Sequence, residues 1–170
     1  LTETDFYSRE AVLKLLEKRQ LPLGLDLENV EPLSWDLTNG NLLYIFEKEW
    51  QNNNMIRNIL CNLSRLGFDT TLLSVSKTQE QYNISREISS HLERKNKIEE
   101  IYDLVCENID LGDRLSQPYI VIWDEIEKLI QENELLSEKI LYILGNGPKI
   151  GLYSFITTVP SLSNSLNVVS

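Results

Sequence analysis

Asp124 and Glu125 directly follow a five-residue apolar run, residues 119–123, and this junction constrains the fold more than any other feature of the chain. A short apolar run without alternation is typical of a strand that is buried on both faces, as in the parallel sheets of α/β proteins. The acidic pair after it has two interpretations. It belongs to a site at the strand end, or it caps a following helix, because carboxylates favour a helix N-terminus.

A second apolar run, residues 42–46, lies upstream and is followed by a polar stretch, residues 47–54. A helical pattern is expected from Met55 onward, because apolar residues then recur at the spacing of one helix face. These residues are Met55, Ile56, Ile59, Leu60, Leu63 and Leu66. The order of strand, loop and helix is the frame of a phosphate-binding loop.

The chemistry of a phosphate-binding loop is missing from this frame. Such a loop needs glycines whose backbone N–H groups surround the phosphates, a lysine for the terminal phosphates, and a Ser or Thr for Mg²⁺. In the best frame these four positions hold Phe46, Gln51, Asn52 and Asn53. The wider loop that we single out as a degenerate binding site comprises Glu49, Trp50, Gln51, Asn52 and Asn53.

The rest of the chain alternates between strand and helix patterns. A short N-terminal helix (6–19) and a hairpin (23–27 with 32–37) precede the first core strand. Further strands are predicted at 71–75 and 152–158. Helices are predicted at 85–108 and over 126–144, the latter stopping at residues 145–148, which contain two glycines and a proline. This order predicts a three-layer α/β domain with a mostly parallel sheet.

Length and charge limit the domain organisation and the classes of partner. The 170 residues, 42% of them hydrophobic, suffice for one compact domain, with residues 1–38 leading into an α/β core at 39–170. The formal net charge of −10 opposes binding to nucleic-acid phosphates and to anionic lipid. The basic residues at 94–97 precede Glu99 and Glu100 and are expected to form a solvated helix face. We therefore expect no direct nucleic-acid or membrane binding, and we read the chain as a piece of a larger protein.

Cysteine, histidine and tryptophan add little chemistry. Cys61, Cys106 and His91 do not have the spacing of metal ligands, so no metal site is expected and the cysteines are expected to be reduced packing residues. Trp35 and Trp123 are predicted to lie in the core. Trp50, in the acidic polar stretch, is expected to pack locally, to anchor a binding partner or to stack on a nucleotide base.

Three segments carry a family resemblance: residues 21–26, residues 118–125 and residues 147–152, in this order around the degenerate loop. They resemble FtsK/SpoIIIE ATPase domains, which are P-loop NTPases of the RecA/FtsK type. The degenerate loop and the acidic character are similar to the C-terminal ATPase-like domain of type VII secretion motors. The resemblance implies a P-loop NTPase fold.

The resemblance also assigns roles to individual positions. In active relatives a lysine binds phosphate, an Asp orders Mg²⁺, the following Glu polarises the attacking water, and a polar residue after the last strand senses the γ-phosphate. Asp124 and Glu125 match by identity, and Thr157 or Thr158 stands at the sensor position. Asn52 stands at the position of the lysine. A charge-assisted hydrogen bond contributes about 1.5–3 kcal/mol, so loss of the lysine is expected to lower nucleotide affinity on the order of 100-fold.

The expected function follows from two features: the strand, loop and helix of an ATPase domain are predicted, but the residues that bind phosphate are missing from the loop. We expect a catalytically silent domain without a cofactor, in the cytoplasmic part of a bacterial cell-membrane protein that can form a homo-hexameric ring. It recruits secreted protein substrates through their export signals or regulates neighbouring ATPase domains. The alternative is a true ATPase that binds Mg-ATP through a noncanonical loop and powers protein export. DNA translocation, a third possibility, is opposed by the negative charge.

Overall fold

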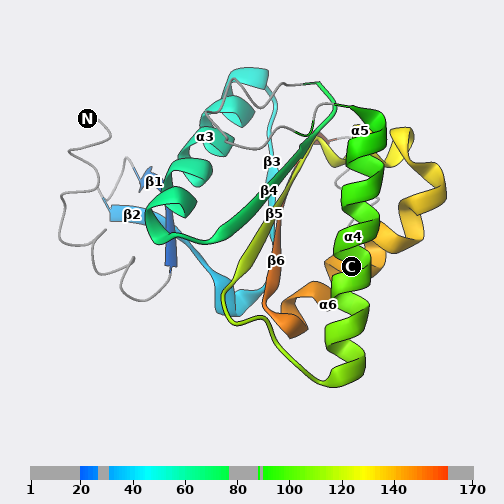
Figure 1. The fold of residues 1–170 in the computed structure, drawn as a ribbon. Helices are drawn as coiled ribbons and strands as arrows, with labels where there is room; N and C mark the ends of the chain where they lie inside the picture. Colours follow the sequence, from blue (N-terminus) through cyan, green and yellow to red (C-terminus); the bar gives the residue numbers. More distant parts are fainter. Residues whose placement is uncertain (1–19, 27–30, 77–87, 89, 161–170) are drawn as a thin grey trace.

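The computed structural model describes residues 20–26, 31–76, 88 and 90–160. Within these ranges the chain forms a four-stranded sheet with helices on both faces and a separate two-stranded hairpin (Figure 1). The predicted N-terminal helix at 6–19 lies outside the described residues.

The central sheet has the strand order β3-β6-β5-β4, and every neighbouring pair is parallel. Its strands are β3 (Leu42–Ile45), β4 (Asp69–Ser74), β5 (Tyr119–Asp124) and β6 (Leu152–Thr158). Because all four run in the same direction, their carboxyl ends meet at one edge of the domain (Figure 1). Asp124, at the end of a central strand, lies at this edge.

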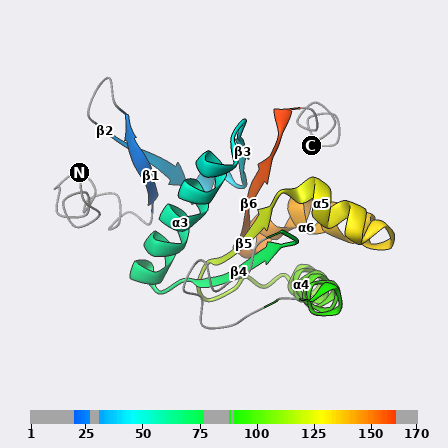
Figure 2. The ribbon, with the colours of Figure 1, turned by 90° about the horizontal axis from the view of Figure 1, so that it is seen from above.

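Helices cover the two faces of the sheet and make a three-layer domain (Figure 2). Helix α3 (Glu49–Leu66) packs on one face through Ile56, Ile59 and Leu63. The opposite face is covered by α4 (His91–Leu111), α5 (Ile126–Glu132) and α6 (Ser137–Ile150), with the short 3-10 helix η3 (Glu134–Leu136) between the last two. The predicted α/β class with a parallel sheet is confirmed.

The hairpin of β1 (Gln20–Asp26) and β2 (Glu31–Asp36) is antiparallel, as predicted, and lies against α3. A 3-10 turn, η1 (Leu37–Asn39), leads from it to β3. Trp35 is buried in the core beside Phe155, with ring centroids 5.8 Å apart, and its indole N–H donates to the carbonyl of Gly40 at 2.9 Å. Trp123 is also buried, so both core predictions for tryptophan are confirmed.

Helix α3 begins at Glu49 rather than at Met55, so the prediction of a polar loop through residue 54 is wrong. The connection from β3 is reduced to Phe46, Glu47 and Lys48. Two side chains explain the early start. Gln51 accepts hydrogen bonds from backbone N–H groups ahead of the helix, and Asn52 is fully buried against the sheet.

Helix α6 continues through Gly145, Gly147 and Pro148, so the predicted stop at residues 145–148 is also wrong. The proline has no N–H for the carbonyl of Leu144, and the amide of Asn41 donates to that carbonyl instead, at 2.6 Å. Gly147 is needed for packing, because a Cβ at this position would lie 2.7 Å from the carbonyl oxygen of Leu152. The helix ends only at Ile150, and Gly151 follows it as a C-cap with positive φ.

Helix α4 confirms the described part of the predicted long helix, with Ser90 as its N-cap. The prediction of a solvated face at residues 94–97 is wrong for Arg94, which is 6% exposed. Its guanidinium donates to both carboxylate oxygens of Glu132 at the end of α5. Buried arginine is tolerated here because its charge is paired.

Candidate functional site

Asp124 is the centre of a buried polar cluster at the carboxyl edge of the sheet. The residue is 1% exposed. Its Oδ1 accepts from the amide of Asn52 at 2.7 Å and from the hydroxyl of Thr157 at 3.2 Å, while its Oδ2 accepts from the hydroxyl of Ser74 at 2.7 Å. The donors come from α3, β6 and β4, so one carboxylate connects three elements of the domain. We call Asn52, Ser74, Thr157 and Asp124 the Asp124 cluster.

The cluster arises from the register of the sheet. Ser74 is paired with Asp124 across β4 and β5, and Thr157 is the next residue on β6 after the last one paired with β5. Asn52 lies in the first turns of α3, directly after the short connection from β3. The Oδ1 of Asn52 is buried and has no hydrogen-bond partner among the described residues. A buried oxygen without a partner costs about 1–3 kcal/mol of stability. The side chain of Asn52 therefore bonds Asp124 through its Nδ2 while its Oδ1 bears this cost.

The connection before α3 is closed by its own side chains. Gln51 Oε1 accepts from the backbone N–H groups of Glu47 at 3.2 Å and Lys48 at 3.1 Å. Phe46 is 3% exposed, and its backbone N–H donates to the carbonyl of Thr158 at 3.0 Å. In a phosphate-binding loop the corresponding N–H groups face the ligand. Here a glutamine oxygen takes two of them.

Glu125 has an unusual backbone and a side chain that is bonded through its Oε2. Its φ of 51° and ψ of 67° lie in the left-handed region, which is unfavourable for a residue with a Cβ. Its N–H donates to the hydroxyl of Thr157 at 2.8 Å. Its carboxylate accepts from the hydroxyl of Ser76 at 2.7 Å and from the ammonium of Lys128 at 3.2 Å. Glu125 holds the N-cap position of α5 but makes no side-chain capping bond, so the capping interpretation is wrong for its side chain.

Thr158 belongs to a neighbouring interaction. Its hydroxyl donates to Glu127 at 3.1 Å. Burial raises the pKa of Glu127, and the nearby charge of Glu125 acts in the same direction, while the hydrogen bond from Thr158 opposes the shift. Thr157 and Thr158 are adjacent in sequence but contact different carboxylates, Asp124 and Glu127, because successive residues of a strand point to opposite faces.

The ion pair between Arg94 and Glu132 contacts the backbone of the Asp124 cluster at Ser74. Arg94, already paired with Glu132, also donates to the backbone carbonyl of Ser74 at 3.5 Å. His91 Nδ1 lies 3.1 Å from Glu132 Oε1. The hydrogen bonds from Arg94, followed by those from His91, hold the pKa of the Glu132 carboxyl below its usual value despite its partial burial. The arginine thereby ties the strand end that presents Ser74 to α4 and α5.

The structure brings together only part of the predicted site. Asn52, Asp124 and Thr157 meet, with Gln51, Glu125 and Thr158 around them. Glu49 and Trp50 lie in the first turn of α3 and are exposed, and Asn53 is half-buried next to Asn52. Trp50 is 59% exposed, which agrees with a surface position and excludes a core role.

Sequence reasoning missed Ser74, Ser76, Glu127 and Arg94. The position of Ser74 carried a usable signal, because it lies one residue before the end of the predicted strand 71–75 and the carboxyl ends of parallel strands meet at one edge. Arg94 carried none, since its place in a basic run resembles a solvated helix face.

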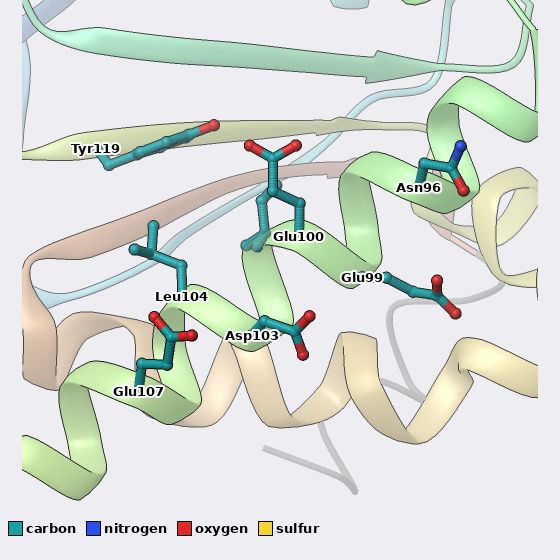
Figure 3. Close-up of a pocket in the computed structure, with 8 residues that line it drawn as sticks. Asn96, Glu99, Glu100, Asp103, Leu104, Glu107 and Tyr119 are labelled. Carbon is teal, nitrogen blue, oxygen red and sulfur yellow. The ribbon is translucent and has the colours of Figure 1, made fainter.

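Two surface hollows occur elsewhere in the described part of the chain. One, with a volume of about 500 Å³, lies beside α4 and Tyr119. Figure 3 shows Tyr119 of β5 on one side of this hollow and a row of acidic side chains from α4 on the other. The acidic residues are Glu99, Glu100, Asp103 and Glu107. The other, about 290 Å³, includes Asp36, Arg114 and Tyr153. Neither hollow includes Asp124 or the connection before α3.

The described residues contain neither a cluster of metal-ligand side chains nor a helix suited to crossing a membrane. No group of three or more His, Cys, Asp or Glu side chains is arranged to hold a metal ion within residues 20–26, 31–76, 88 and 90–160. None of the helices in these same ranges combines the length and apolarity required to cross a membrane.

Comparisons with known proteins gave matches in structure alone. No protein-family model matches the sequence. No curated protein matches it either.

The solved structures that match are ATPases of the EssC and EccC type. EssC (ATPases 2 and 3) from Geobacillus thermodenitrificans matches with a TM-score of 0.73 and 16% identity, over 92% of this chain and 31% of that one. The cytoplasmic domain of EssC matches with a TM-score of 0.67 and 14% identity, over 97% of this chain and 36% of that one. Thermomonospora curvata EccC (ATPases 2 and 3), solved in complex with a signal sequence peptide, matches with a TM-score of 0.66 and 14% identity, over 86% of this chain and 30% of that one.

The chain thus spans about a third of the length of these solved relatives. Identities this low establish the fold and leave the activity to be argued from the site. The structure and these matches agree with the α/β fold predicted from the sequence, and this chain has the fold of an ATPase domain of the EssC and EccC motors of type VII secretion.

Proposed function

We propose that this chain is a nucleotide-silent ATPase-like domain of a type VII secretion motor, which recruits secreted proteins or regulates the active ATPase domains beside it. The observation that carries the proposal is the hydrogen bond of 2.7 Å between Asn52 and Asp124. It joins the position of the phosphate-binding lysine to the position of the Mg²⁺-ordering aspartate. Side chains of the protein therefore take the place of the ligand that these two positions serve in an ATPase.

The residues of the site do not fit Mg-ATP. Mg²⁺ requires oxygen ligands that it can reach, and Asp124 is 1% exposed with its carboxylate enclosed by three protein donors. A triphosphate requires free N–H groups and a cation, and Gln51 takes the N–H groups of Glu47 and Lys48. The exposed Glu47 and Glu49 place negative charge at the start of α3, where a triphosphate would bind. Like unit charges about 4 Å apart repel by a few kcal/mol, so these carboxylates oppose binding of the triphosphate.

The partner class rests on the matched structures. One of them is an EccC with ATPases 2 and 3 bound to a signal sequence peptide, and another is the cytoplasmic domain of EssC. We extend these properties to this chain as part of the proposal. It acts on the cytoplasmic side of a membrane-bound motor, contacts neighbouring ATPase domains of the same polypeptide, and joins a homo-hexameric ring with them.

Calorimetric titration with Mg-ATP tests the silent site. We expect no binding heat up to millimolar nucleotide from the native chain. The double variant Gln51→Gly, Asn52→Lys restores a glycine and the lysine in the loop and frees two N–H groups, so we expect it to gain measurable binding. Micromolar binding by the native chain that Asp124→Asn weakens would overturn the proposal.

Recruitment is tested separately, by fluorescence anisotropy with labelled signal-sequence peptides from type VII substrates of the same bacterium. We expect saturable binding that Mg-ATP does not change. A scrambled peptide of the same composition is the control for charge. Equal binding of native and scrambled peptides would remove the recruitment role and leave regulation of neighbouring domains.

One observation favours the alternative of an ATPase with a noncanonical loop. Glu125 is held in a left-handed conformation at the position of the water-polarising glutamate, and strained residues cluster at functional sites. Under this alternative, donors from a neighbouring subunit replace the missing lysine. ATP hydrolysis by the full motor that Glu125→Gln in this domain abolishes would establish it.

A further inference from the structure

The outer side of α3 differs in charge from the chain as a whole. Residues 50–66 contain no Asp or Glu, although the chain carries 26 acidic residues and a formal net charge of −10. Trp50, Asn54, Arg57 and Asn58 are exposed and stand at positions i, i+4, i+7 and i+8, so they share one side of the helix. We call these four residues the α3 face. It presents a large aromatic ring and a cation on one surface.

The α3 face has the composition of a protein interface. Trp and Arg are among the residue types enriched at the hot spots of interfaces, and a buried tryptophan removes about 150–250 Å² from water. Trp50 is 59% exposed. In the described part of the chain, no acidic side chain lies within salt-bridge distance of Arg57. The surface that complements this face is a partly apolar hollow with carboxylates around it.

The hollow of about 500 Å³ beside α4 has this chemistry. Its lining includes the aromatic ring of Tyr119 and the apolar side chains of Ile101 and Leu104. Residues 98–111 of α4 carry five acidic side chains and no Lys or Arg, and four of the five line the hollow (Figure 3). An aromatic ring can pack on Tyr119, while a cation beside it reaches the carboxylates of α4.

Two carboxylates of the hollow have no cation from their own domain. Glu99 and Glu100 each have a lysine ammonium within 4.0 Å. No Lys, Arg or His among the described residues lies within salt-bridge distance of Asp103 or Glu107. These two residues are four apart on α4, so they are neighbours on the helix surface. One guanidinium, with its fork of N–H donors, can bond both.

We propose that the α3 face of one copy of the chain docks into the hollow beside α4 of a second copy. Trp50 enters the hollow next to Tyr119. Arg57 pairs with Asp103 and Glu107 at its rim. The two surfaces carry opposite charge, and this complementarity fixes which face meets which.

The contact is head-to-tail, because α3 and α4 cover opposite faces of the sheet (Figure 2). Each copy in a pair keeps one unused α3 face or one unused hollow for the next copy. Such a heterologous contact closes into a ring or continues as a filament. The inference thus rests on the ring assembly in the proposed function and names the two surfaces that meet in it.

The net charge of the chain does not prevent this contact at physiological salt. The Debye length is then about 8 Å, so distant charges are screened while groups in contact are screened much less. An 18-residue helix is about 27 Å long and about 10 Å wide, so its footprint is well below the roughly 800 Å² per partner of a standard interface. We therefore expect weak association of the separate chain, strengthened in a ring where two neighbours hold each copy.

Tryptophan fluorescence tests the contact on the 170-residue chain, because Trp50 is exposed while Trp35 and Trp123 are buried. We expect the emission maximum to move to shorter wavelength between micromolar and millimolar protein, together with a rise in mass measured by sedimentation. Trp50→Ala should abolish the shift and lower the association constant at least about 10-fold, as expected for a hot-spot residue. A constant maximum and a monomeric mass up to millimolar protein would overturn the proposal.

Charge reversal separates a head-to-tail contact from other modes of association. Arg57→Glu alters only the α3 face, and the double variant Asp103→Lys, Glu107→Lys alters only the hollow, so neither should self-associate. An equimolar mixture should associate again, because the native face then meets the native hollow and the reversed face meets the reversed hollow. Asp110→Lys, an exposed α4 position outside the lining, is the matched control and should associate like the native chain. Variants that still self-associate, or a mixture that stays monomeric, would overturn the proposal.

Failure of this inference can be distinguished from failure of the proposed function. Neither experiment contains nucleotide or signal peptide, so both leave the silent site and the recruitment role untouched. A full motor polypeptide that forms its ring equally well with Trp50→Ala would overturn the surfaces named here and leave the ring in place. A shift of the Trp50 emission that appears only when signal-sequence peptide is added would overturn the second copy as occupant and assign the α3 face to a substrate.

Discussion

The strand end at Asp124 and the connection at Phe46–Lys48 lie side by side at the carboxyl edge, yet their polar groups are satisfied in opposite ways. At the strand end one buried acceptor collects donors from three other elements, since Asn52, Ser74 and Thr157 all donate to Asp124. At the connection the N–H groups of Glu47 and Lys48 are bonded locally, by the side chain of Gln51 in the first turn of α3.

The difference teaches that burial decides how costly it is to leave a polar group without a partner. A buried carboxylate that holds no ligand must be satisfied by the protein, because an unpaired buried charge is strongly destabilising. An exposed connection has no such requirement, since water can satisfy its N–H groups. We therefore expect the strand end to be stabilising and the connection to be nearly neutral. Four substitutions test this contrast.

The largest effect is expected for Asp124→Ala. It removes the acceptor of three buried donors, each charge-assisted bond contributing about 1.5–3 kcal/mol, so the free energy of unfolding should fall by about 3–5 kcal/mol. Urea denaturation followed by circular dichroism measures it, with the exposed Asp113→Ala as control. Unchanged or increased stability would show instead a carboxylate kept for a ligand, as in sites where function costs stability.

A smaller loss is expected for Asn52→Ala. Removing the amide deletes one bond to Asp124, at a cost of about 2 kcal/mol, and relieves the orphaned Oδ1. The exposed Asn54→Ala, on the same helix, should change stability by less than about 0.5 kcal/mol. A double-mutant cycle with Asp124→Ala should give a coupling of about 1 kcal/mol or more. Additive losses would mean that the bond does not link the two sides of the edge.

Gln51→Ala should cost only about 0.5–1 kcal/mol, the usual effect of removing a side chain that caps a helix start. Gln51→Glu should recover or exceed native stability, because a carboxylate accepts more strongly from N–H groups at a helix N-terminus. Thermal unfolding compares the three proteins. A loss as large as that of Asp124→Ala would erase the distinction between the connection and the strand end.

The smallest effect is expected for Glu127→Gln, and it should depend on pH. Burial raises the pKa of Glu127 above the ordinary value of a glutamate side chain. The stability associated with the protonated group is fully present below the unfolded pKa and is lost as pH rises through the folded pKa. The variant should therefore gain a few tenths of a kcal/mol over the native chain at neutral pH, discounted for solvent screening, and nothing at low pH. A constant difference across pH would refute this assignment.

The sequence predicted the order of strands and helices because the signals were local. The apolar runs at 42–46 and 119–123 and the helical periodicities each lie within a few residues. The two boundary errors, at Met55 and at residues 145–148, have a common cause. In each case a tertiary contact supplied what the local pattern lacked, through Asn52 in α3 and through Asn41 at the carbonyl of Leu144.

The candidate site was predicted in part. Asp124, Glu125 and Asn52 were singled out because motif spacing placed them, and Thr157 because it stands in the last strand. Ser74 and Arg94 were not, since their role depends on which strands are neighbours and on which helix packs beneath them.

The sequence by itself determined the α/β class, the burial of Trp35 and Trp123, and the absence of glycine from the stretch 46–54 and of lysine from position 52, because each is a property of composition or of short-range periodicity. Only the tertiary structure decided that Asn52 and Asp124 face one another, that Gln51 bonds the N–H groups of the connection, and that Ser74 and Thr157 join Asp124 at the strand ends. Within the described residues, these outcomes depend on strand order and register, which bring together residues as far apart in the chain as 52 and 124.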